Sequence, residues 1–257
     1  MKVFIIGTGN VAAALGSAFK KAGHEITGVF GLHPAKVEAL HKKLNCKGFN
    51  SLLEIPNNSD VYLLAVSDDA IQSVAKQIKI NQGIIVHTSG STDISVLGKF
   101  KNKGVFYPVE TIKFNHPKSF KKVPLCLEAS NESTLKKLMK LAHPVSYKIY
   151  ILNSKERAEL HLAAVFTNNF TNHLIGISQD ILEKIHLPVE LLEQLAHSTI
   201  KNAFLSDPVK SQTGPAVRND KKTINKHLDL LKKDKSRQDI YKILTKDIVN
   251  VHNKKYK

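Results

Sequence analysis

Cysteine, arginine and long apolar runs are all scarce in this sequence, and each shortage excludes a class of protein. Only two cysteines, Cys46 and Cys126, occur in 257 residues, and they lie far apart. This spacing excludes a cysteine-rich metal site, and no metal is expected. We expect both cysteines to be small buried thiols in strands, in a reducing compartment, so the predicted location is cytoplasmic. No uncharged apolar run reaches the ~18 residues of a membrane span.

The shortage of arginine decides what the strong positive charge means. The formal net charge is +16, which on its own indicates a nucleic acid or a membrane surface as partner. Of the 38 basic residues, however, only Arg157, Arg218 and Arg237 carry the guanidinium that favours base and phosphate recognition. The lysines occur in scattered pairs such as Lys20-Lys21. We therefore expect a solvated, lysine-rich surface that attracts small anions, and neither a nucleic-acid nor a membrane partner.

A glycine turn follows the first apolar run of the chain. Residues 3–6 are Val-Phe-Ile-Ile, and Gly7-x-Gly9-x-x-Ala12 comes next, followed by small and apolar residues. A strand, a tight turn and a helix in this order form a dinucleotide-binding fingerprint. Gly7 permits the turn, Gly9 lets the backbone approach a pyrophosphate, and Ala12 lets the helix pack closely on the strand. The unpaired N–H groups at the start of that helix then face phosphate.

A secretory signal peptide is the alternative for the same segment, because Lys2 precedes an apolar stretch with small residues. An apolar signal core does not usually contain Gly7-x-Gly9-Asn10 or end in a lysine pair. The nucleotide-binding interpretation therefore has the better support.

Strand and helix patterns alternate through the first 152 residues. A chain of 257 residues is long enough for one large or two ordinary domains. The alternation predicts an α/β domain over residues 1–152, with a doubly wound, mostly parallel sheet of Rossmann type. The predicted strands after the first cover residues 25–31, 46–48, 60–66, 83–88, 104–107, 123–129 and 145–151, and the predicted helices cover residues 10–21, 34–44, 69–78 and 131–141.

The pattern changes after residue 152, where no further strand-like run occurs. We expect an all-α domain over residues 153–257, for substrate binding and dimerisation. Its helices are predicted at residues 154–186, 188–204, 221–233 and 236–253. The first of them is apolar on nearly every side, so it should be buried against its own domain and a second subunit. The protein is therefore expected to form a homodimer.

The choice of cofactor depends on the end of the second predicted strand. An NAD site normally places Asp or Glu there, to bind the ribose 2′-hydroxyl. Residues 31–36 contain no acid. A missing carboxylate with His33 and Lys36 nearby suits the 2′-phosphate of NADP(H), although an ordinary solvated turn is the alternative for both residues.

Other strand ends should line the same site, because ligands bind at the carboxyl ends of the strands in a doubly wound sheet. Ser67 and Ser89 are expected near ribose and nicotinamide. Asp68 or Asp69 is expected to cap the following helix, and His87 is either a core histidine or a catalytic one. The predicted cofactor-binding residues are Gly7, Thr8, Gly9, Asn10, Val11, His33, Lys36, Val66, Ser67 and Ser89.

Polar residues stand out on the long predicted helix. His161, Val165, Asn168 and Asn172 follow each other at spacings of four, three and four residues, and Asn169 lies on the flank of this stripe. Polar groups on an apolar helix are costly without partners. They either form hydrogen bonds between helices or face the nicotinamide and hold a substrate carbonyl or carboxylate.

A second cluster, residues 212–220, predicts a rigid turn that leads into a helix. Arg218 is placed there to bind a carboxylate through two parallel hydrogen bonds. Asp220 is well placed to cap the helix that begins at Lys221, and pairing with Asp220 is the alternative for Arg218.

Six segments carry a resemblance to a known family. They are Gly-Thr-Gly-Asn-Val-Ala (7–12), Val-Ser-Asp-Asp-Ala-Ile (66–71), His-Thr-Ser-Gly (87–90), Tyr-Pro-Val-Glu-Thr (107–111), Val-Phe-Thr-Asn-Asn-Phe-Thr-Asn-His-Leu (165–174) and Thr-Gly-Pro-Ala-Val-Arg-Asn-Asp (213–220). Together the six segments extend over nearly the whole chain. On these segments the chain resembles predicted NADP-dependent oxidoreductases with a Rossmann-like domain and a helical C-terminal domain. That family is related to β-hydroxyacid dehydrogenases, pyrroline-carboxylate reductases and ketopantoate reductases.

The lysine-rich, arginine-poor composition is similar to that of the non-orthologous ketopantoate reductases of pantothenate biosynthesis. This resemblance implies an NADPH-dependent reduction of a small anionic 2-oxo acid, 2-dehydropantoate (ketopantoate), to pantoate by a 2-dehydropantoate 2-reductase. One feature departs from the related reductases, which carry Lys and, four residues later, Asn on the first interdomain helix. Here Lys155 lacks that partner.

His161 is therefore the hypothesised proton donor, directly or through water. In the same hypothesis Asn169 and Asn172 orient the carbonyl, and Arg218 holds the carboxylate. Two alternatives stay open. One is imine reduction of the pyrroline-carboxylate reductase type, which needs no strong protein acid, and the other is an NADP-binding sensor without catalysis.

Overall fold

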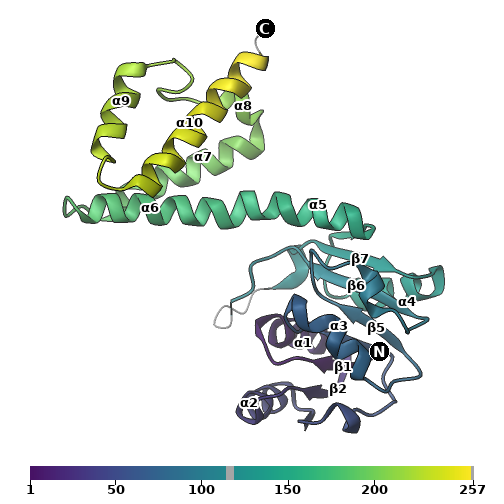
Figure 1. Ribbon diagram of the computed structural model, residues 1–257. Coiled ribbons are helices and arrows are strands. Elements are labelled where there is room, and N and C mark those ends of the chain that lie inside the picture. Colours follow the sequence, from purple (N-terminus) through teal and green to yellow (C-terminus); the bar gives the residue numbers. More distant parts are fainter. Residues whose placement is uncertain (114–118, 256–257) are drawn as a thin grey trace. The chain divides into compact units, whose positions relative to one another are not determined.

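Two compact units make up the chain in the computed structural model, which describes residues 1–113 and 119–255 (Figure 1). The sheet unit spans Met1–Thr167 and the helical unit spans Asn168–Lys257. The last strand ends at Ile151, and the next helix begins at Ser154.

The sheet unit is built on eight strands in the order β3-β2-β1-β4-β5-β6-β7-β8. Strands β1 to β6 run parallel, whereas β7 is antiparallel to β6, and β8 is parallel to β7. The predicted doubly wound, mostly parallel sheet is confirmed, with its last two strands reversed. The strands are β1 (Lys2–Ile6), β2 (Glu25–Phe30), β3 (Lys47–Phe49), β4 (Val61–Leu64), β5 (Ile84–His87), β6 (Lys103–Pro108), β7 (Leu125–Ala129) and β8 (Ile149–Ile151).

Alternate side chains of the central strands enter two separate cores. The helices over these cores are α1 (Asn10–Lys21), α2 (Pro34–Leu44), α3 (Asp68–Gln77) and α4 (Glu132–Ala142). In β1, Val3 and Ile5 belong to the core that contains the buried residues of α1, α2 and α4. Phe4 and Ile6 belong to the other core, together with Ile71 of α3. Because both faces are covered, these strands are apolar over most of their length.

Local signals in the sequence set the helix ends. Pro34 opens α2, and Asn45 ends it in the left-handed conformation with a φ of 50°. Asn131 caps α4 by accepting a hydrogen bond of 2.9 Å from the N–H of Thr134. Three short 3-10 helices have no counterpart among the predicted elements: η1 (Leu52–Glu54), η2 (Ile94–Leu97) and η3 (Phe120–Lys122).

The two cysteines are free thiols. Cys126 lies in β7 and is buried, as predicted. Cys46 is half-buried but precedes β3, so its predicted place in a strand is wrong; the left-handed residue Asn45 delays the strand to Lys47. Burial raises the pKa of both thiols to about 11, which keeps them unreactive.

The helix predicted at residues 154–186 is not uniform. Its first part, α5 (Ser154–Ala164), begins with a capping box between Asn153 and Glu156. A π-helix, η4 (Val165–Phe170), follows, and α6 (Thr171–Glu183) continues from it. Each turn of a π-helix holds more residues than an α-helical turn, so the α-helical spacing assumed from His161 to Asn172 does not apply across η4.

The described residues of the helical unit contain no strand, as expected. After α6 come η5 (Val189–Leu192), α7 (Glu193–Leu205), α8 (Pro208–Ser211), α9 (Lys221–Leu230) and α10 (Lys235–Lys255). The short helix α8 falls in a segment for which no helix is predicted. Its N-cap residue, Asp207, accepts a hydrogen bond of 2.9 Å from the N–H of Val209.

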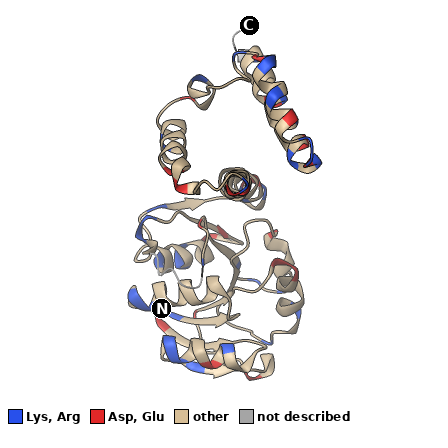
Figure 2. Ribbon diagram, turned by 90° about the vertical axis from the view of Figure 1, so that its left-hand side faces the viewer, with Lys and Arg blue, Asp and Glu red and all other residues tan. Residues whose placement is uncertain are grey.

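Lysine and arginine lie on helices of both units rather than on one element (Figure 2). This distribution agrees with the scattered lysine pairs of the sequence. Within the described part of the chain, none of the helices is both long enough and apolar enough to cross a membrane.

Candidate active site

Gly7 forms a turn that only glycine fits. Its φ is +122°, and a Cβ there would lie 2.2 Å from the carbonyl oxygen of Ala65. Its N–H donates a hydrogen bond of 2.8 Å to the carbonyl of Phe30. The turn therefore joins the carboxyl ends of β1, β2 and β4 at one edge of the sheet.

The start of α1 is open and uncapped. Gly9 is the N-cap residue, no described side chain caps the helix, and the first turn contains no acidic residue. A Cβ built on Gly9 would have no heavy atom within 4 Å. The first N–H groups of α1 therefore remain available to an anion. Both the space and the donors fit the pyrophosphate of a dinucleotide.

The segment that joins β2 to α2 is basic. Among the described residues, the first turn of α2 contains no acidic side chain. His33 and Lys36 are exposed there. Glu38, further along α2, accepts bonds from Lys42 (2.7 Å) and His41 (2.8 Å). These hydrogen bonds, first to Lys42 and then to His41, hold the pKa of Glu38 below its ordinary value. The edge of the site thus suits a ribose 2′-phosphate better than a free 2′-hydroxyl.

The loops after β4 and β5 are tied to each other. Ser67 is the N-cap residue of α3, whereas Asp68 and Asp69 lie in its first turn, so the expected cap at Asp68 or Asp69 is wrong. The carboxylate of Asp68 instead accepts a hydrogen bond of 2.8 Å from Ser91 Oγ. This bond fixes the two loops that should flank a bound dinucleotide.

Ser89 and His87 stabilise the loop after β5 through hydrogen bonds. Ser89 Oγ accepts from the N–H groups of Ser91 (3.2 Å) and Thr92 (3.0 Å) and donates to Thr92 Oγ1 (2.9 Å). His87 is fully buried, and its Nδ1 accepts from the N–H of Ser89 at 3.2 Å. Burial, aided by the charge of Arg157, lowers the pKa of His87 to about 4. His87 is therefore a neutral core histidine, the first of its two expected roles.

Arg157 holds this loop to the start of α5. Its side chain is 1% exposed. Its Nη1 lies 2.5 Å from Glu128 Oε2, its Nε donates to the carbonyl of Ser89 (3.2 Å), and its Nη2 donates to the carbonyl of Thr92. A buried charge needs such partners on every side. No pattern in the sequence predicts a role for Arg157, and the scarcity of arginine is the one signal that marks it.

His161 lies beside the same loop, on α5, opposite Tyr107 of β6. Tyr107 Oη and His161 Nδ1 are 3.2 Å apart. A Cβ on Gly90 would lie 2.7 Å from His161 Nδ1 and 2.7 Å from Tyr107 Cζ. The pair thus stands over the loop at the carboxyl ends of β5 and β6. Tyr107 is far from His161 in sequence, and no local pattern marks the contact.

Comparisons with known proteins agree with this geometry. Residues 2–89 match the family described as NADP oxidoreductase coenzyme F420-dependent, and residues 123–248 match a domain of unknown function. A solved structure from Bacteroides fragilis, assigned as an NADP oxidoreductase, is 31% identical, covers 97% of this chain and 98% of its own, and gives a TM-score of 0.88. The chain belongs to this NADP oxidoreductase family. Its cofactor is NADP(H), as the end of β2 predicted.

More distant structures share the fold of this NADP oxidoreductase. An imine reductase from Myxococcus stipitatus in complex with NADP+ is 16% identical, covers 99% of this chain and 93% of its own, and has a TM-score of 0.64. A 1-pyrroline-5-carboxylate reductase from Streptococcus pyogenes is 14% identical, covers 98% of both chains and has a TM-score of 0.64. No curated protein matches the sequence.

The other predicted catalytic residues of the NADP oxidoreductase lie in its helical unit. Asn169 in η4 and Asn172 in α6 are exposed, and so is Arg218 in the turn before α9. Asp220 caps α9, accepting from Thr223 N–H (3.0 Å) and Thr223 Oγ1 (2.7 Å), which confirms its predicted role. His161 belongs to the sheet unit, so neither unit by itself brings all four predicted catalytic residues together.

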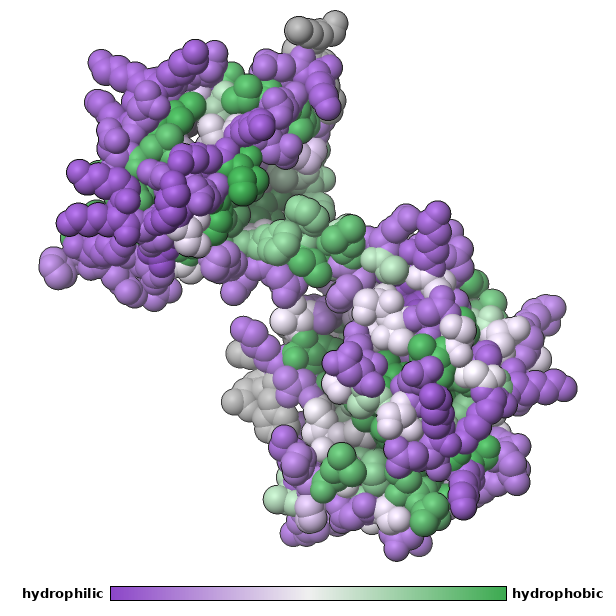
Figure 3. Space-filling view, viewed as in Figure 1, coloured by the Kyte–Doolittle hydropathy of each residue, from purple (hydrophilic) through white to green (hydrophobic). Residues whose placement is uncertain are grey.

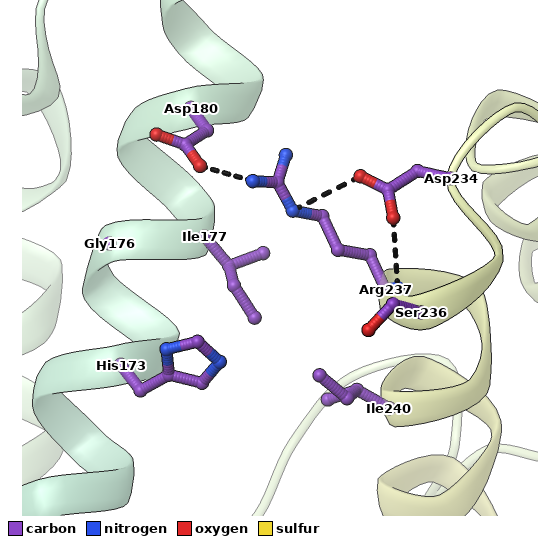
Figure 4. A pocket seen from close by; sticks show the side chains of 8 residues that line it. All are labelled: His173, Gly176, Ile177, Asp180, Asp234, Ser236, Arg237 and Ile240. Atoms are coloured by element: carbon purple, nitrogen blue, oxygen red, sulfur yellow. Dashed lines mark hydrogen bonds and ion pairs between the residues drawn. The ribbon is translucent and has the colours of Figure 1, made fainter.

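A cavity of about 420 Å³ lies between α6 and α10 in the helical unit (Figure 4). The side chain of Arg237 lines this cavity. It forms ion pairs with Asp180 and, at 3.3 Å, with Asp234. His173 and Ile240 line the same space. Because two carboxylates already neutralise Arg237, this cavity offers no unpaired cation for an acidic substrate.

Proposed function

We propose that this NADP oxidoreductase reduces the carbonyl of a small 2-oxo acid, with the reduction of 2-dehydropantoate to pantoate as the first candidate reaction. The observation that carries the proposal is the position of His161. Its ring lies over Gly90 at the carboxyl edge of the sheet, the same edge that holds the open start of α1. This position supports the proposal that a proton donor and the dinucleotide act at the same edge of the sheet.

The proposed roles of the cofactor and of His161 follow from this position. Bound NADPH supplies a hydride. His161 gives the proton that the substrate oxygen then needs. Arg157 holds the loop beside His161 in place, because it donates to the carbonyls of Ser89 and Thr92 while it pairs with Glu128.

Groups of the helical unit would recognise the acid. Arg218 is exposed and, among the described residues, makes no ion pair. The hydrogen bonds from Thr223, and also the charge of Arg218, lower the pKa of nearby Asp220. The exposed guanidinium of Arg218 can also bind a substrate carboxylate through two hydrogen bonds. Asn169 and Asn172 are exposed amides suited to orienting a carbonyl. The net charge of +16 adds a field that attracts an anionic substrate.

Imine reduction is the second candidate. The likeness in fold to an imine reductase and to a 1-pyrroline-5-carboxylate reductase favours it. The same rim suits a C=N bond, and reduction of an imine depends less on a strong protein acid. NADP sensing without turnover is the third possibility.

An NADPH oxidation assay with a panel of 2-oxo acids and cyclic imines separates these candidates. We expect turnover of 2-oxo acids, and a His161→Ala variant that loses about 100-fold or more in kcat with little change in NADPH affinity. Turnover of imines alone would support the second candidate. NADPH binding with no turnover of either class would favour the sensor and contradict the proposal.

Gly9→Ala tests the cofactor site without disturbing the fold. The φ of Gly9 is −81°, which alanine adopts, and its Cβ would touch no protein atom. We therefore expect an unchanged melting temperature but a Kd for NADPH raised about 10-fold or more, because the methyl group occupies the approach of the pyrophosphate. Gly176→Ala, also without a neighbour within 4 Å, is the matched control. Equal NADPH affinity in both variants would place the dinucleotide elsewhere.

We further propose that the protein is a homodimer and works in the cytoplasm. The dimer is supported by the large apolar side chains exposed on α6 and α7, including Leu174, Ile175 and Leu195. The location is supported by the two free thiols, which suit a reducing compartment.

A further inference from the structure

Tyr107 and His161 are held together by two rigid elements. Tyr107 lies near the carboxyl end of β6, between β5 and β7, where it faces Cys126 across the antiparallel pair. His161 lies 54 residues further along the chain, in α5. Their rings meet edge to face, with centroids 6.1 Å apart and planes at 71°. The distance between Oη and Nδ1 is 3.2 Å.

Gly90 makes room for this contact. Any larger residue would place its Cβ 2.7 Å from an atom of each ring. The loop that carries Gly90 is in turn fixed by Arg157, through the carbonyls of Ser89 and Thr92. On the side of Gly90, the space around the pair is therefore bounded by backbone that Arg157 holds in place.

Burial keeps Tyr107 in its neutral form. Desolvation is the main cause that raises the pKa of Tyr107 above its ordinary value, and the neighbouring Cys126 adds to it. A neutral phenol can both donate and accept a hydrogen bond, whereas a phenolate only accepts. Tyr107 can thus bond His161 in either charge state of the imidazole.

We propose that Tyr107 is a positioning residue that keeps a proton on Nε2 of His161, an inference that rests on the proposed reductase function. When the ring is neutral, the hydroxyl of Tyr107 donates to Nδ1, and the single ring proton sits on Nε2. When the ring is charged, Nδ1–H donates to the oxygen of Tyr107, and Nε2 still carries a proton. Nε2–H therefore points away from Tyr107 in both states.

The free side of the ring fits this assignment. Among the described residues, Nε2 of His161 has no hydrogen-bond partner, and it is not enclosed as Nε2 of His87 is. Hydride addition to the carbonyl carbon leaves the electron pair of the C=O π bond on oxygen. The Nε2–H bond of the charged imidazole then breaks, and its proton forms the O–H bond of the alcohol. The ring left behind is briefly neutral with its proton on Nδ1. Water then protonates Nε2, and loss of the Nδ1 proton to solvent returns the neutral ring to its resting Nε2–H form.

Tyr107→Phe tests this role, because it removes one oxygen and keeps the ring. We expect kcat to fall at least about 10-fold, as when the group orienting a catalytic histidine is lost, with the Kd for NADPH unchanged. Nitrogen-15 NMR of the ring nitrogens supplies a second measurement. In the wild-type protein at high pH the neutral ring of His161 should carry its proton on Nε2, whereas the variant should show a mixture of both tautomers.

Tyr62→Phe is the matched control. It also removes a buried hydroxyl, which bonds Pro56 and Ser59 at the opposite end of β4. It should lower the melting temperature and leave kcat and the tautomer of His161 as they are. If Tyr107→Phe does not fold, Gly90→Ala replaces it, since the added methyl group pushes the two rings apart.

These experiments distinguish the positioning role of Tyr107 from the proposed reductase function. Full activity of Tyr107→Phe, or the same tautomer in variant and wild type, overturns the role of Tyr107 while the reductase function stands. Failure of the wild-type protein to reduce any 2-oxo acid or imine overturns the function, and the role of Tyr107 falls with it.

Discussion

Single residues decide how this protein responds to acid, and His87 shows why. It is fully buried next to Arg157, and its pKa is lowered from 6.5 to about 4. The unfolded chain therefore binds a proton at His87 between these two values, whereas the folded protein does not. Above pH 6.5, His87 is neutral in both states and does not lower the free energy of unfolding. As pH falls from 6.5 towards 4, protonation of the unfolded chain lowers that free energy. The full difference corresponds to at most about 3 kcal/mol.

Replacing His87 with asparagine removes this titration. Asparagine keeps an oxygen that can accept from the N–H of Ser89, as Nδ1 of His87 does. Urea unfolding at pH 7 and at pH 4.5 should show a smaller loss of unfolding free energy in the variant than in the wild-type protein, by about 1 to 3 kcal/mol. Equal losses in the two proteins would mean that His87 is not held neutral in the native state.

Elements with a strong local signal could be predicted from the sequence. The predicted bounds of α1 and α2 agree with the structure, because a glycine turn and Pro34 mark their starts and left-handed Asn45 ends α2. The reversed direction of β7 was not predicted, since an apolar run is the same whichever way a strand runs. The π-helix η4 was missed because α-helical periodicity was assumed for the whole of α5 and α6.

In the candidate site, too, some residues could be predicted from the sequence and others could not. Gly7 and Gly9 belong to a short motif, so their geometry at the end of β1 could be foreseen. The contact between Tyr107 and His161 depends on how β6 and α5 pack, which no local spacing encodes. The same holds for Arg157, whose partners Glu128 and Ser89 lie on β7 and in the loop after β5. Residues that act across elements are therefore the ones that sequence patterns leave out.

At the scale of the whole molecule, the helical unit exposes many large apolar side chains. Phe204 is 77% exposed and Leu205 is 73% exposed at the end of α7. Figure 3 shows hydrophobic side chains on the surface of this unit. Monomeric proteins rarely leave large apolar patches in water, whereas stable dimers bury roughly 1,200–2,000 Å² in total. The proposed second subunit offers a cover for these side chains.

Sedimentation and light scattering can test the dimer directly. The wild-type protein should have about twice the chain mass of 28.5 kDa. Leu195→Glu, on α7, should shift the protein towards the monomer, because a buried carboxylate at an apolar interface has no partner. Leu53→Glu is the control, since Leu53 is equally exposed but lies in η1 of the sheet unit. A monomeric wild-type protein would leave the apolar surface of the helical unit in water and contradict the proposed assembly. If Leu195→Glu is monomeric and also loses turnover while keeping its NADPH affinity, the second subunit is needed for the reaction and not for binding the cofactor.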